Sequence, residues 1–128
     1  NILKKKKNCK IILKNQKNIF LIEPVDYIDF IYLMRLSYLI LTDSGGIQEE
    51  APSMGKPVLL MRDTSERPEA IDAGTVLKVG ADKDNIIKYC QKLINDNSLY
   101  DSMSNLNNPF GDGRAAEKIK NHLKNLNL

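Results

Sequence analysis

The sequence predicts an α/β protein whose parallel β-sheet is covered by helices on both faces. Four apolar runs of strand length occur at residues 19–22, 38–41, 58–61 and 76–79, each flanked by polar or turn-forming residues. Segments with apolar residues at helical spacing lie between and after these runs. Short apolar strands that alternate with helices are typical of parallel sheets, because both faces of such a sheet are buried.

The composition is typical of a folded domain and argues against a nucleic-acid-binding protein. Of the 128 residues, 42% are hydrophobic and 27% are charged, so we expect a single domain over residues 1–128. The formal net charge is +3, but residues 1–17 hold seven lysines and no acidic residue, whereas residues 18–113 have a net charge of −7. A nucleic-acid-binding surface needs basic residues spread over the fold, with arginine or aromatic residues among them. We therefore expect the N-terminal lysines to be solvated.

Three further absences in the sequence limit the possible functions. No apolar run approaches the roughly 20 residues of a membrane span, so we expect a cytoplasmic protein with no membrane partner. Cys9 and Cys90 are far apart and show no CxxC spacing, which predicts reduced structural thiols. His122 is the one histidine and lies in a lysine-rich stretch, so neither a metal site, a cofactor nor a histidine-based catalytic triad is expected.

The helices of the first half follow from periodicity and stop signals. Residues 25–36 have apolar side chains at helical spacing and predict an amphipathic helix. A second helix is predicted to begin at residues 43–46 and to end near Gly55 and Pro57, because glycine followed by proline stops a helix. Four strands are few for such a sheet, and residues 2–17 supply at most one helix or one further strand. We therefore expect an incomplete sheet edge on the N-terminal side.

The second half is predicted to be mainly helical. Asp82 or Asp84 is expected to cap a helix, and a shorter helix follows over residues 99–106. A turn-rich segment at residues 107–113 precedes a terminal helix over residues 114–126. We expect the apolar side of this terminal helix to be exposed or paired with another copy of the chain in a homo-oligomer. This side consists of Ala115, Ile119, Leu123 and Leu126.

The stretch over residues 39–50 carries the chemistry. An apolar strand runs directly into Ser44, Gly45 and Gly46, which begin a helix. In an open parallel sheet this order places the N-terminal end of a helix at the carboxyl edge, where ligands bind. The two glycines lack the Cβ atoms that would block close approach, so backbone N–H groups and the Ser44 hydroxyl can face a phosphate.

Glu50 makes the predicted ligand more specific. Its carboxylate, one and a half turns into the same helix, would repel a phosphate but accept two hydrogen bonds from a ribose diol, so the two features together predict a nucleotide. Neither a GxGxxG fingerprint nor a Gly-Lys-Ser/Thr phosphate loop occurs. The alternative interpretation is structural: Ser44 caps the helix, the glycines make a tight turn and Glu50 is solvated.

Five motifs occur in order along the chain. They are TDSGGIQEEAP (residues 42–52), GKPVL (55–59), MRDTSERPEA (61–70), GT (74–75) and NPFGDG (108–113). Together they closely resemble the C-terminal domain of non-hydrolysing UDP-N-acetylglucosamine 2-epimerases. The resemblance covers about residues 18–114 and is most specific over residues 42–70. Phe110 stands where the family more often has tyrosine.

The resemblance implies both a fold and a reaction. Members of this family fold as two Rossmann-like halves around a cleft, like glycosyltransferases of the B type (GT-B), and this chain would be the three-layer C-terminal half. They interconvert UDP-N-acetylglucosamine (UDP-GlcNAc) and UDP-N-acetylmannosamine by eliminating UDP to leave a 2-acetamidoglucal. UDP is added back after the C2 proton is replaced on the other face. The implied ligand is thus UDP or UDP-GlcNAc, and the implied process is cell-envelope polysaccharide biosynthesis.

The resemblance also implies roles at matching positions. Ser44, Gly45 and Gly46 would hold the diphosphate, where N–H donors stabilise the negative charge that grows on the leaving group. Glu50 would take the ribose hydroxyls. Phe30 matches a position near uracil, through its backbone, although an apolar residue on an amphipathic helix is more often part of a core.

Four charged residues are further candidates for the cleft. They are Asp43, Glu66, Arg67 and Glu69. Arg67 would add a cation to the cleft, and the equal alternative is an ion pair with Glu66 or Glu69.

No catalytic residue is predicted within this chain. The family's catalytic carboxylates belong to the other domain, its catalytic histidine lies in an upstream His-Arg motif, and His122 lies outside that motif. We therefore predict that the N-terminal catalytic domain is absent and that the chain alone does not epimerise UDP-GlcNAc. A separate N-terminal half is then an expected partner. The alternatives are a stand-alone UDP-sugar-binding module and half of a GT-B glycosyltransferase.

Overall fold

The computed structural model describes residue 13 and residues 16–126. The chain divides into two compact units, Asn1–Ile31 and Tyr32–Leu128. Cys9 and nearly all of the lysine-rich opening lie outside the described residues, so the predicted helix or strand at residues 2–17 stays a prediction.

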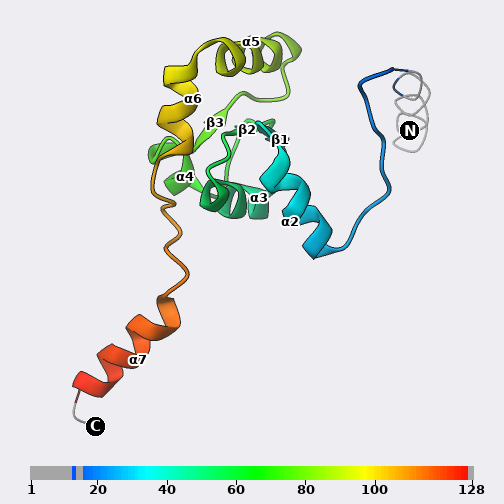
Figure 1. Cartoon of the computed structure of the whole chain (residues 1–128). Helices are drawn as coiled ribbons and strands as arrows, with labels where there is room; N and C mark the ends of the chain where they lie inside the picture. Colours follow the sequence, from blue (N-terminus) through cyan, green and yellow to red (C-terminus); the bar gives the residue numbers. More distant parts are fainter. Residues whose placement is uncertain (1–12, 14–15, 127–128) are drawn as a thin grey trace. The chain divides into compact units, whose positions relative to one another are not determined.

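A three-stranded parallel sheet forms the centre of the second unit (Figure 1). Its strands are β1 (Ile40–Thr42), β2 (Val58–Leu60) and β3 (Val76–Lys78), in the order β1-β2-β3. All three residues of the central strand β2 are fully buried. The predicted parallel α/β class is confirmed, and three of the four predicted strands form.

The predicted strand at residues 19–22 is wrong. Residues 19–26 have no regular secondary structure, and the side chains of Phe20 and Ile22 are 84% and 63% exposed. An apolar run becomes a strand only when a neighbouring strand takes up its backbone hydrogen bonds. The sheet that the described residues form contains β1, β2 and β3 alone.

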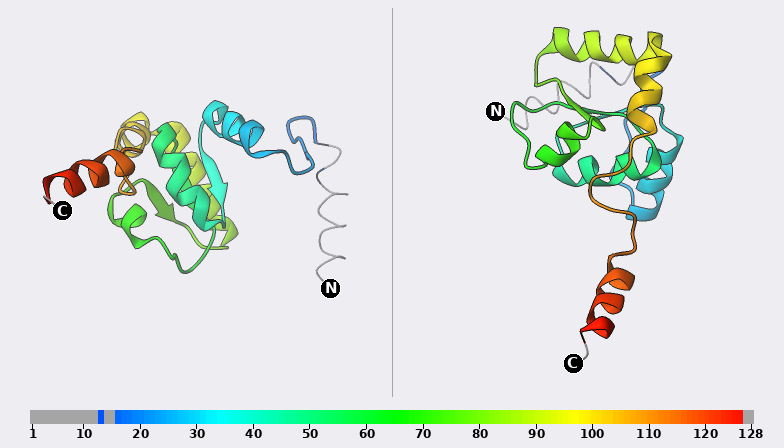
Figure 2. Two further views of the ribbon diagram at one scale, coloured as in Figure 1. Left: turned by 90° about the horizontal axis from the view of Figure 1, so that it is seen from below. Right: turned by 90° about the vertical axis from the view of Figure 1, so that its left-hand side faces the viewer.

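Helices cover both faces of the sheet, which confirms the three-layer arrangement. Helices α5 (Lys83–Asn95) and α6 (Asn97–Ser104) lie on one side, and α3 (Gly45–Glu50) and α4 (Pro68–Asp72) lie on the other (Figures 1 and 2). Successive side chains of a strand point to opposite faces of the sheet. Leu59 accordingly packs with Leu93 of α5, Met103 of α6 and Val79 in one buried cluster.

Capping residues define the starts of helices α5 and α6. The Asp82 carboxylate accepts a hydrogen bond of 2.8 Å from the backbone N–H of Asn85, so Asp82 rather than Asp84 caps α5. Asp96 caps α6 in the same way, by accepting from Leu99 over 2.9 Å. A cap of this kind contributes about 1 kcal/mol to the stability of the helix.

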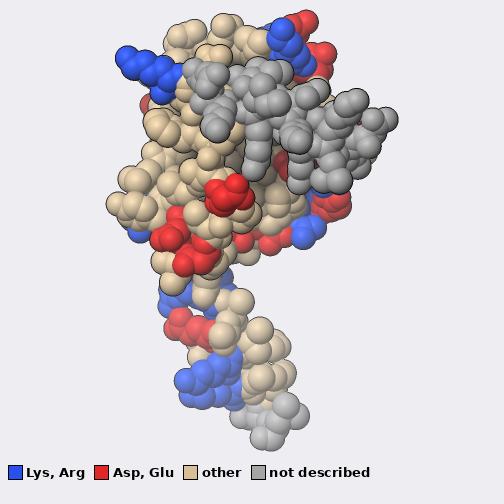
Figure 3. Space-filling view, turned by 90° about the vertical axis from the view of Figure 1, so that its right-hand side faces the viewer, with Lys and Arg blue, Asp and Glu red and all other residues tan. Residues whose placement is uncertain are grey.

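The first and last described helices lie close to the predicted ranges. Helix α2 (Tyr27–Leu36) begins after Asp26, whose carboxylate accepts from the Asp29 backbone N–H over 3.0 Å. Helix α7 (Ala115–Asn125) contains no buried residue, and His122 is exposed. In Figure 3, charged side chains, most of them basic, gather on one side of the segment at the bottom of the view and uncharged residues on the other. Ile119, Leu123 and Leu126 of its apolar side are at least half exposed in the single chain, and pairing of this side with another copy stays a prediction.

Two smaller findings concern the membrane and the cysteines. Among the described helices, none is long and apolar enough to cross a membrane. Cys90, on α5, is a half-buried free thiol whose pKa is raised by burial. Cys90 packs against the buried cluster around Leu59, as a structural cysteine would, and its reduced state stays a prediction.

Candidate functional site

The chain passes from β1 into α3 through Asp43 and Ser44. The backbone N–H of Ser44 donates a 3.0 Å hydrogen bond to the Thr42 Oγ1 atom, and the Met61 N–H donates over 2.8 Å to the Thr42 carbonyl oxygen. Since β1 and β2 are parallel, the start of α3 and the loop after β2 meet at the carboxyl edge of the sheet. This is the edge at which the sequence predicts the ligand.

The Ser44 side chain does not cap α3. Ser44 has the extended backbone of an N-cap residue, but its hydroxyl makes no capping hydrogen bond, and the residue is exposed. The fully buried Gln48 stabilises the turn instead: its Nε2 donates to the Ser44 carbonyl oxygen over 3.3 Å, and its Oε1 accepts from the Ser65 hydroxyl over 2.7 Å. The structural interpretation of Ser44 as a side-chain cap is therefore wrong, and its hydroxyl remains accessible at the turn.

Gly45 and Gly46 are not required by the backbone conformation. Neither has a positive φ angle, whereas Gly55, which ends the 3₁₀-helix η1 (Ala51–Met54), has φ of 65°. A Cβ atom on Gly45 or Gly46 would meet no atom outside the turn and helix backbone closer than 3.9 Å, which is ordinary van der Waals contact. Glycine inside a helix costs about 1 kcal/mol relative to alanine. Two glycines that the fold does not need are consistent with close approach of a ligand.

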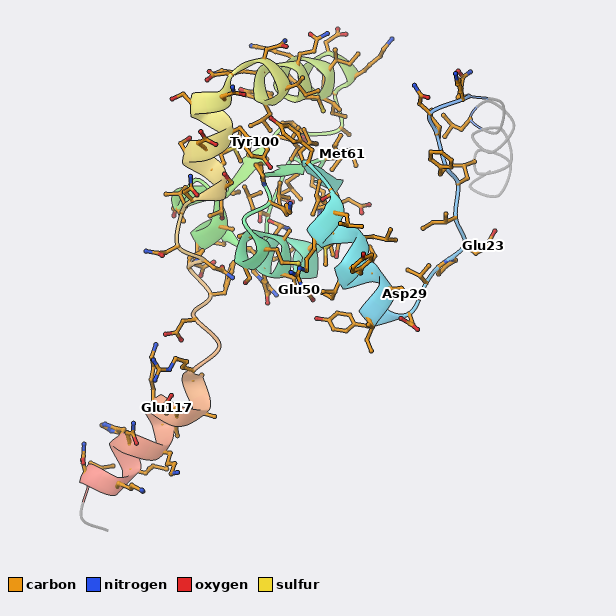
Figure 4. The ribbon with its side chains drawn as sticks, in the orientation of Figure 1. Glu23, Asp29, Glu50, Met61, Tyr100 and Glu117 are labelled. Carbon is orange, nitrogen blue, oxygen red and sulfur yellow. The ribbon has the colours of Figure 1, made fainter. Side chains whose placement is uncertain are left out.

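Glu50 and Ser44 flank Gly46. Glu50 is the last residue of α3 and is half-buried (Figure 4). Its Oε1 atom and the Ser44 Oγ atom each lie 4.0 Å from the position that a Cβ atom would take on Gly46. The structure thus brings together the Ser44 hydroxyl, the glycine pair and the Glu50 carboxylate, which are all candidate ligand-binding groups predicted from the sequence.

Arg62 lies in the same region and is not among the candidate residues predicted from the sequence. It follows β2 and forms two hydrogen bonds with Glu66, with Nη1 to Oε2 at 2.9 Å and Nη2 to Oε1 at 2.5 Å. Its Nη1 also donates to the backbone carbonyl oxygen of Asp43 over 3.4 Å. The Arg62 guanidinium holds the pKa of Glu66 below its ordinary value. The position of Arg62 at the carboxyl end of a strand was the available signal.

The predicted ion-pair partners of Arg67 are wrong. The Arg67 guanidinium pairs with Glu49 of α3, and this contact raises the pKa of Arg67. Glu66 is already paired with Arg62, and Glu69 is exposed in the first turn of α4. Because Arg67 directly precedes α4, its side chain can extend back to α3, which sequence spacing alone does not reveal.

Asn108 connects the turn-rich segment of residues 107–113 to this site. Its side-chain amide donates to the Glu49 carbonyl oxygen over 2.9 Å and also to the Ser53 hydroxyl. A cavity of about 790 Å³ lies where this segment meets η1, lined among others by Pro52, Ser53 and Gly113. Asn108 is the first residue of the NPFGDG motif, but the sequence predicts no role for it.

Phe30 lies on α2, in the first unit, and is 38% exposed, so it is not a fully buried core residue. Its position beside uracil stays a prediction.

Among the described residues, no group of three or more His, Cys, Asp or Glu side chains is arranged to hold a metal ion.

Known proteins resemble this chain in both sequence and structure. A UDP-N-acetylglucosamine 2-epimerase from Campylobacter jejuni is 62% identical over 117 residues, which are 91% of this chain and 30% of that protein. The crystal structure of a UDP-GlcNAc 2-epimerase from Neisseria meningitidis bound to UDP-GlcNAc matches with a TM-score of 0.88 and 50% identity, over 94% of this chain and 33% of the other. The S. aureus MnaA–UDP co-structure matches with a TM-score of 0.86 and 50% identity, over 98% of this chain and 34% of the other.

These matches show what the chain is related to and how much of its relatives it spans. The chain has about a third of the length of the relatives that it matches. The family model described as UDP-N-acetylglucosamine 2-epimerase matches residues 3–124, nearly the whole chain. The chain therefore belongs to the UDP-N-acetylglucosamine 2-epimerase family.

Proposed function

We propose that this chain is the C-terminal nucleotide-binding part of a UDP-GlcNAc 2-epimerase and that it binds UDP and UDP-GlcNAc at the start of α3. The observation that carries the proposal is the glycine pair, Gly45 and Gly46, which neither the backbone conformation nor the local packing requires. Family membership supports it, as do the related structures described with UDP-GlcNAc and with UDP.

The proposed roles follow from charge and hydrogen-bonding capacity. The backbone N–H groups at the start of α3 and the Ser44 hydroxyl donate to the diphosphate, which the absence of Cβ atoms on Gly45 and Gly46 lets approach closely. The Glu50 carboxylate accepts hydrogen bonds from the two ribose hydroxyls. A carboxylate is suited to a diol because each of its oxygens accepts one hydroxyl proton.

The chemical contribution of this site is to stabilise the leaving group. When the anomeric C–O bond breaks, negative charge grows on the UDP diphosphate. Donors that are already oriented towards that charge stabilise the transition state more than the ground state, and this lowers the barrier to elimination. Removal and return of the C2 proton need acid and base groups, which in the proposal come from the remaining two-thirds of the protein. The chain alone is then inactive.

Isothermal titration calorimetry tests the nucleotide site. We expect the chain to bind UDP with a dissociation constant of about micromolar order. Glu50→Gln weakens UDP binding by about tenfold and leaves the binding of 2′,3′-dideoxy-UDP unchanged, because the lost hydrogen bonds are those to the ribose hydroxyls. Glu117→Gln on α7 is the matched control and leaves both affinities unchanged. Equal losses for both nucleotides would contradict the role assigned to Glu50.

An epimerase assay tests the second part of the proposal. The chain alone is expected to convert no UDP-GlcNAc, and activity is expected when it is mixed with a fragment that supplies the missing two-thirds of the Campylobacter jejuni relative. Normal turnover by the chain alone would contradict the proposed division of roles. UDP binding without activity in the mixture would instead identify a stand-alone UDP-sugar-binding module.

A further inference from the structure

The turn before α7 contains the aspartate–glycine pair Asp112 and Gly113, which the proposed nucleotide site does not use. We infer that Asp112 is a site of spontaneous isomerisation to isoaspartate, and that Lys118 of α7 slows this reaction by holding the Asp112 carboxylate. The modification needs no nucleotide, so it is independent of the proposed function.

The reaction uses only the two residues and water. The backbone nitrogen of Gly113 attacks the Cγ atom of the protonated Asp112 carboxyl group, and the proton of the nitrogen leaves with the hydroxyl group as water. The new C–N bond closes a five-membered succinimide ring. Water then opens the ring: cleavage of the bond between the nitrogen and the original backbone carbonyl leaves isoaspartate, and cleavage of the bond to Cγ restores aspartate. The product has the mass of the starting chain.

The surroundings of Gly113 leave room for the ring. A Cβ atom on Gly113 would meet no heavy atom within 4 Å, and the residue has a φ angle of 78°. Helix α6 ends at Ser104 and α7 begins at Ala115, so the pair lies outside regular structure. The Asp112 side chain is 54% exposed. Because glycine has no side chain to shield the attacking nitrogen, the Asp112 carboxyl group can approach it from solvent.

Three hydrogen bonds oppose this approach. The Asp112 Oδ1 atom accepts from the Arg114 backbone N–H over 3.0 Å, and the Lys118 Nζ atom donates to Oδ1 over 3.2 Å and to Oδ2 over 3.0 Å. The hydrogen bond from Lys118, and then that from Arg114, lower the pKa of the Asp112 carboxyl group. An ionised carboxylate resists nucleophilic attack because the oxygen that must leave carries no proton. Lys118 therefore both fixes the side chain and keeps it in the less reactive form.

The protecting lysine lies on a helix that has few other attachments. Helix α7 contains no buried residue, and Lys118 joins it to the turn through Asp112. Isoaspartate lengthens the backbone by one methylene group and moves the carboxylate to a new position. Isomerisation therefore removes the contact with Lys118 and changes how the chain enters α7.

Measurement of isoaspartate during storage near neutral pH tests the inference. Isoaspartyl methyltransferase labels the new carboxylate, and chromatography with mass spectrometry separates the two peptides of equal mass. We expect isoaspartate at Asp112 in the unmodified chain, and about threefold faster accumulation in Lys118→Gln, the size of effect expected from an exposed ion pair. Lys118→Arg keeps the charge and should retain the slow rate.

Two controls separate this role from a general effect of charge or exposure. Lys120→Gln removes the same charge from an exposed position of α7 and should leave the rate unchanged. Asp101, which is exposed and precedes Ser102 within α6, should isomerise more slowly because the helix fixes its backbone. Circular dichroism establishes that each variant is folded. The inference is overturned if Lys118→Gln forms no isoaspartate at Asp112, or forms it no faster than Lys120→Gln.

Discussion

The side-chain amide of Asn108 donates a 2.9 Å hydrogen bond to the backbone carbonyl oxygen of Glu49, 59 residues earlier in the chain. Carbonyl groups near the C-terminal end of a helix need hydrogen-bond partners from outside the helix. Glu49 lies near that end of α3, the helix that begins at Gly45. Asn108 therefore fastens the turn-rich segment of residues 107–113 to the helix that carries the proposed diphosphate site.

Replacement of Asn108 tests whether this contact stabilises the fold. Asn108→Ala removes the donor to the Glu49 carbonyl oxygen and should lower the free energy of unfolding by about 1–2 kcal/mol. Urea unfolding followed by circular dichroism measures the change. Asn121→Ala, at an exposed position of α7, is the control and should change the free energy by less than about 0.5 kcal/mol. Equal effects of the two substitutions would contradict the role of Asn108.

Leu59 is expected to be the centre of the core between the sheet and α5. It is fully buried on the central strand and packs against Leu93 and Met103. Leu59→Ala leaves a cavity and should lower the free energy of unfolding by about 3 kcal/mol. Leu41→Ala on the neighbouring strand is the matched control, because Leu41 is 39% exposed. A cost for Leu41→Ala as large as that for Leu59→Ala would show that the core lies elsewhere.

The pKa of Glu66 reports on its contact with Arg62. The hydrogen bonds from Arg62 lower this pKa from the ordinary value of 4.5, and an NMR titration of the side-chain carboxyl group should show a midpoint below that value. Arg62→Gln should move the midpoint upwards.

The same shift predicts how stability depends on pH. A carboxyl group with a lowered pKa in the folded state stabilises the fold above its unfolded pKa, and this contribution is lost as the pH falls through the folded pKa. The free energy of unfolding should therefore fall more steeply below about pH 4.5 in the unmodified chain than in Arg62→Gln. Identical pH profiles would mean that the ion pair does not form in solution.

Cys90 should react slowly with alkylating reagents. Burial raises the pKa of its thiol, and the thiolate is the reactive form, so the folded protein holds less of that form at pH 8. Iodoacetamide labelling followed by peptide mass spectrometry should show slower modification of Cys90 in the native chain than in urea. Equal rates would indicate that α5 does not protect this side chain.

Local signals in the sequence were enough to predict most of the fold. The apolar runs around Ile40, Val58 and Val76 predicted the three strands, and the candidate caps Asp82 and Asp84 predicted where α5 starts, although not which of them caps it. The turn at Ser44 was predicted from the order strand, glycine pair, helix. Each of these signals lies within a few residues of the structure that it specifies, so no knowledge of distant contacts was needed.

Features that depend on distant partners could not be predicted in the same way. Residues 19–22 look like a strand, but strand formation depends on a neighbour that the apolar pattern does not specify. The pairing of Arg67 with Glu49 depends on how α4 and α3 are placed by the sheet. Gln48 and Asn108 act through backbone carbonyl groups, which leave no trace in the sequence of the acceptor residue.

Replacement of Gly46 by alanine tests UDP binding at the α3 turn most directly. An added methyl group meets only ordinary contacts, to Glu50 and Ser44 at 4.0 Å, and alanine favours the helix. Gly46→Ala should therefore raise the free energy of unfolding by about 0.5–1 kcal/mol. It should also weaken UDP binding by about tenfold or more, because the methyl group occupies the space of the diphosphate. Equal UDP affinity of Gly46→Ala and the unmodified chain, measured by calorimetry, would contradict a diphosphate site at this turn.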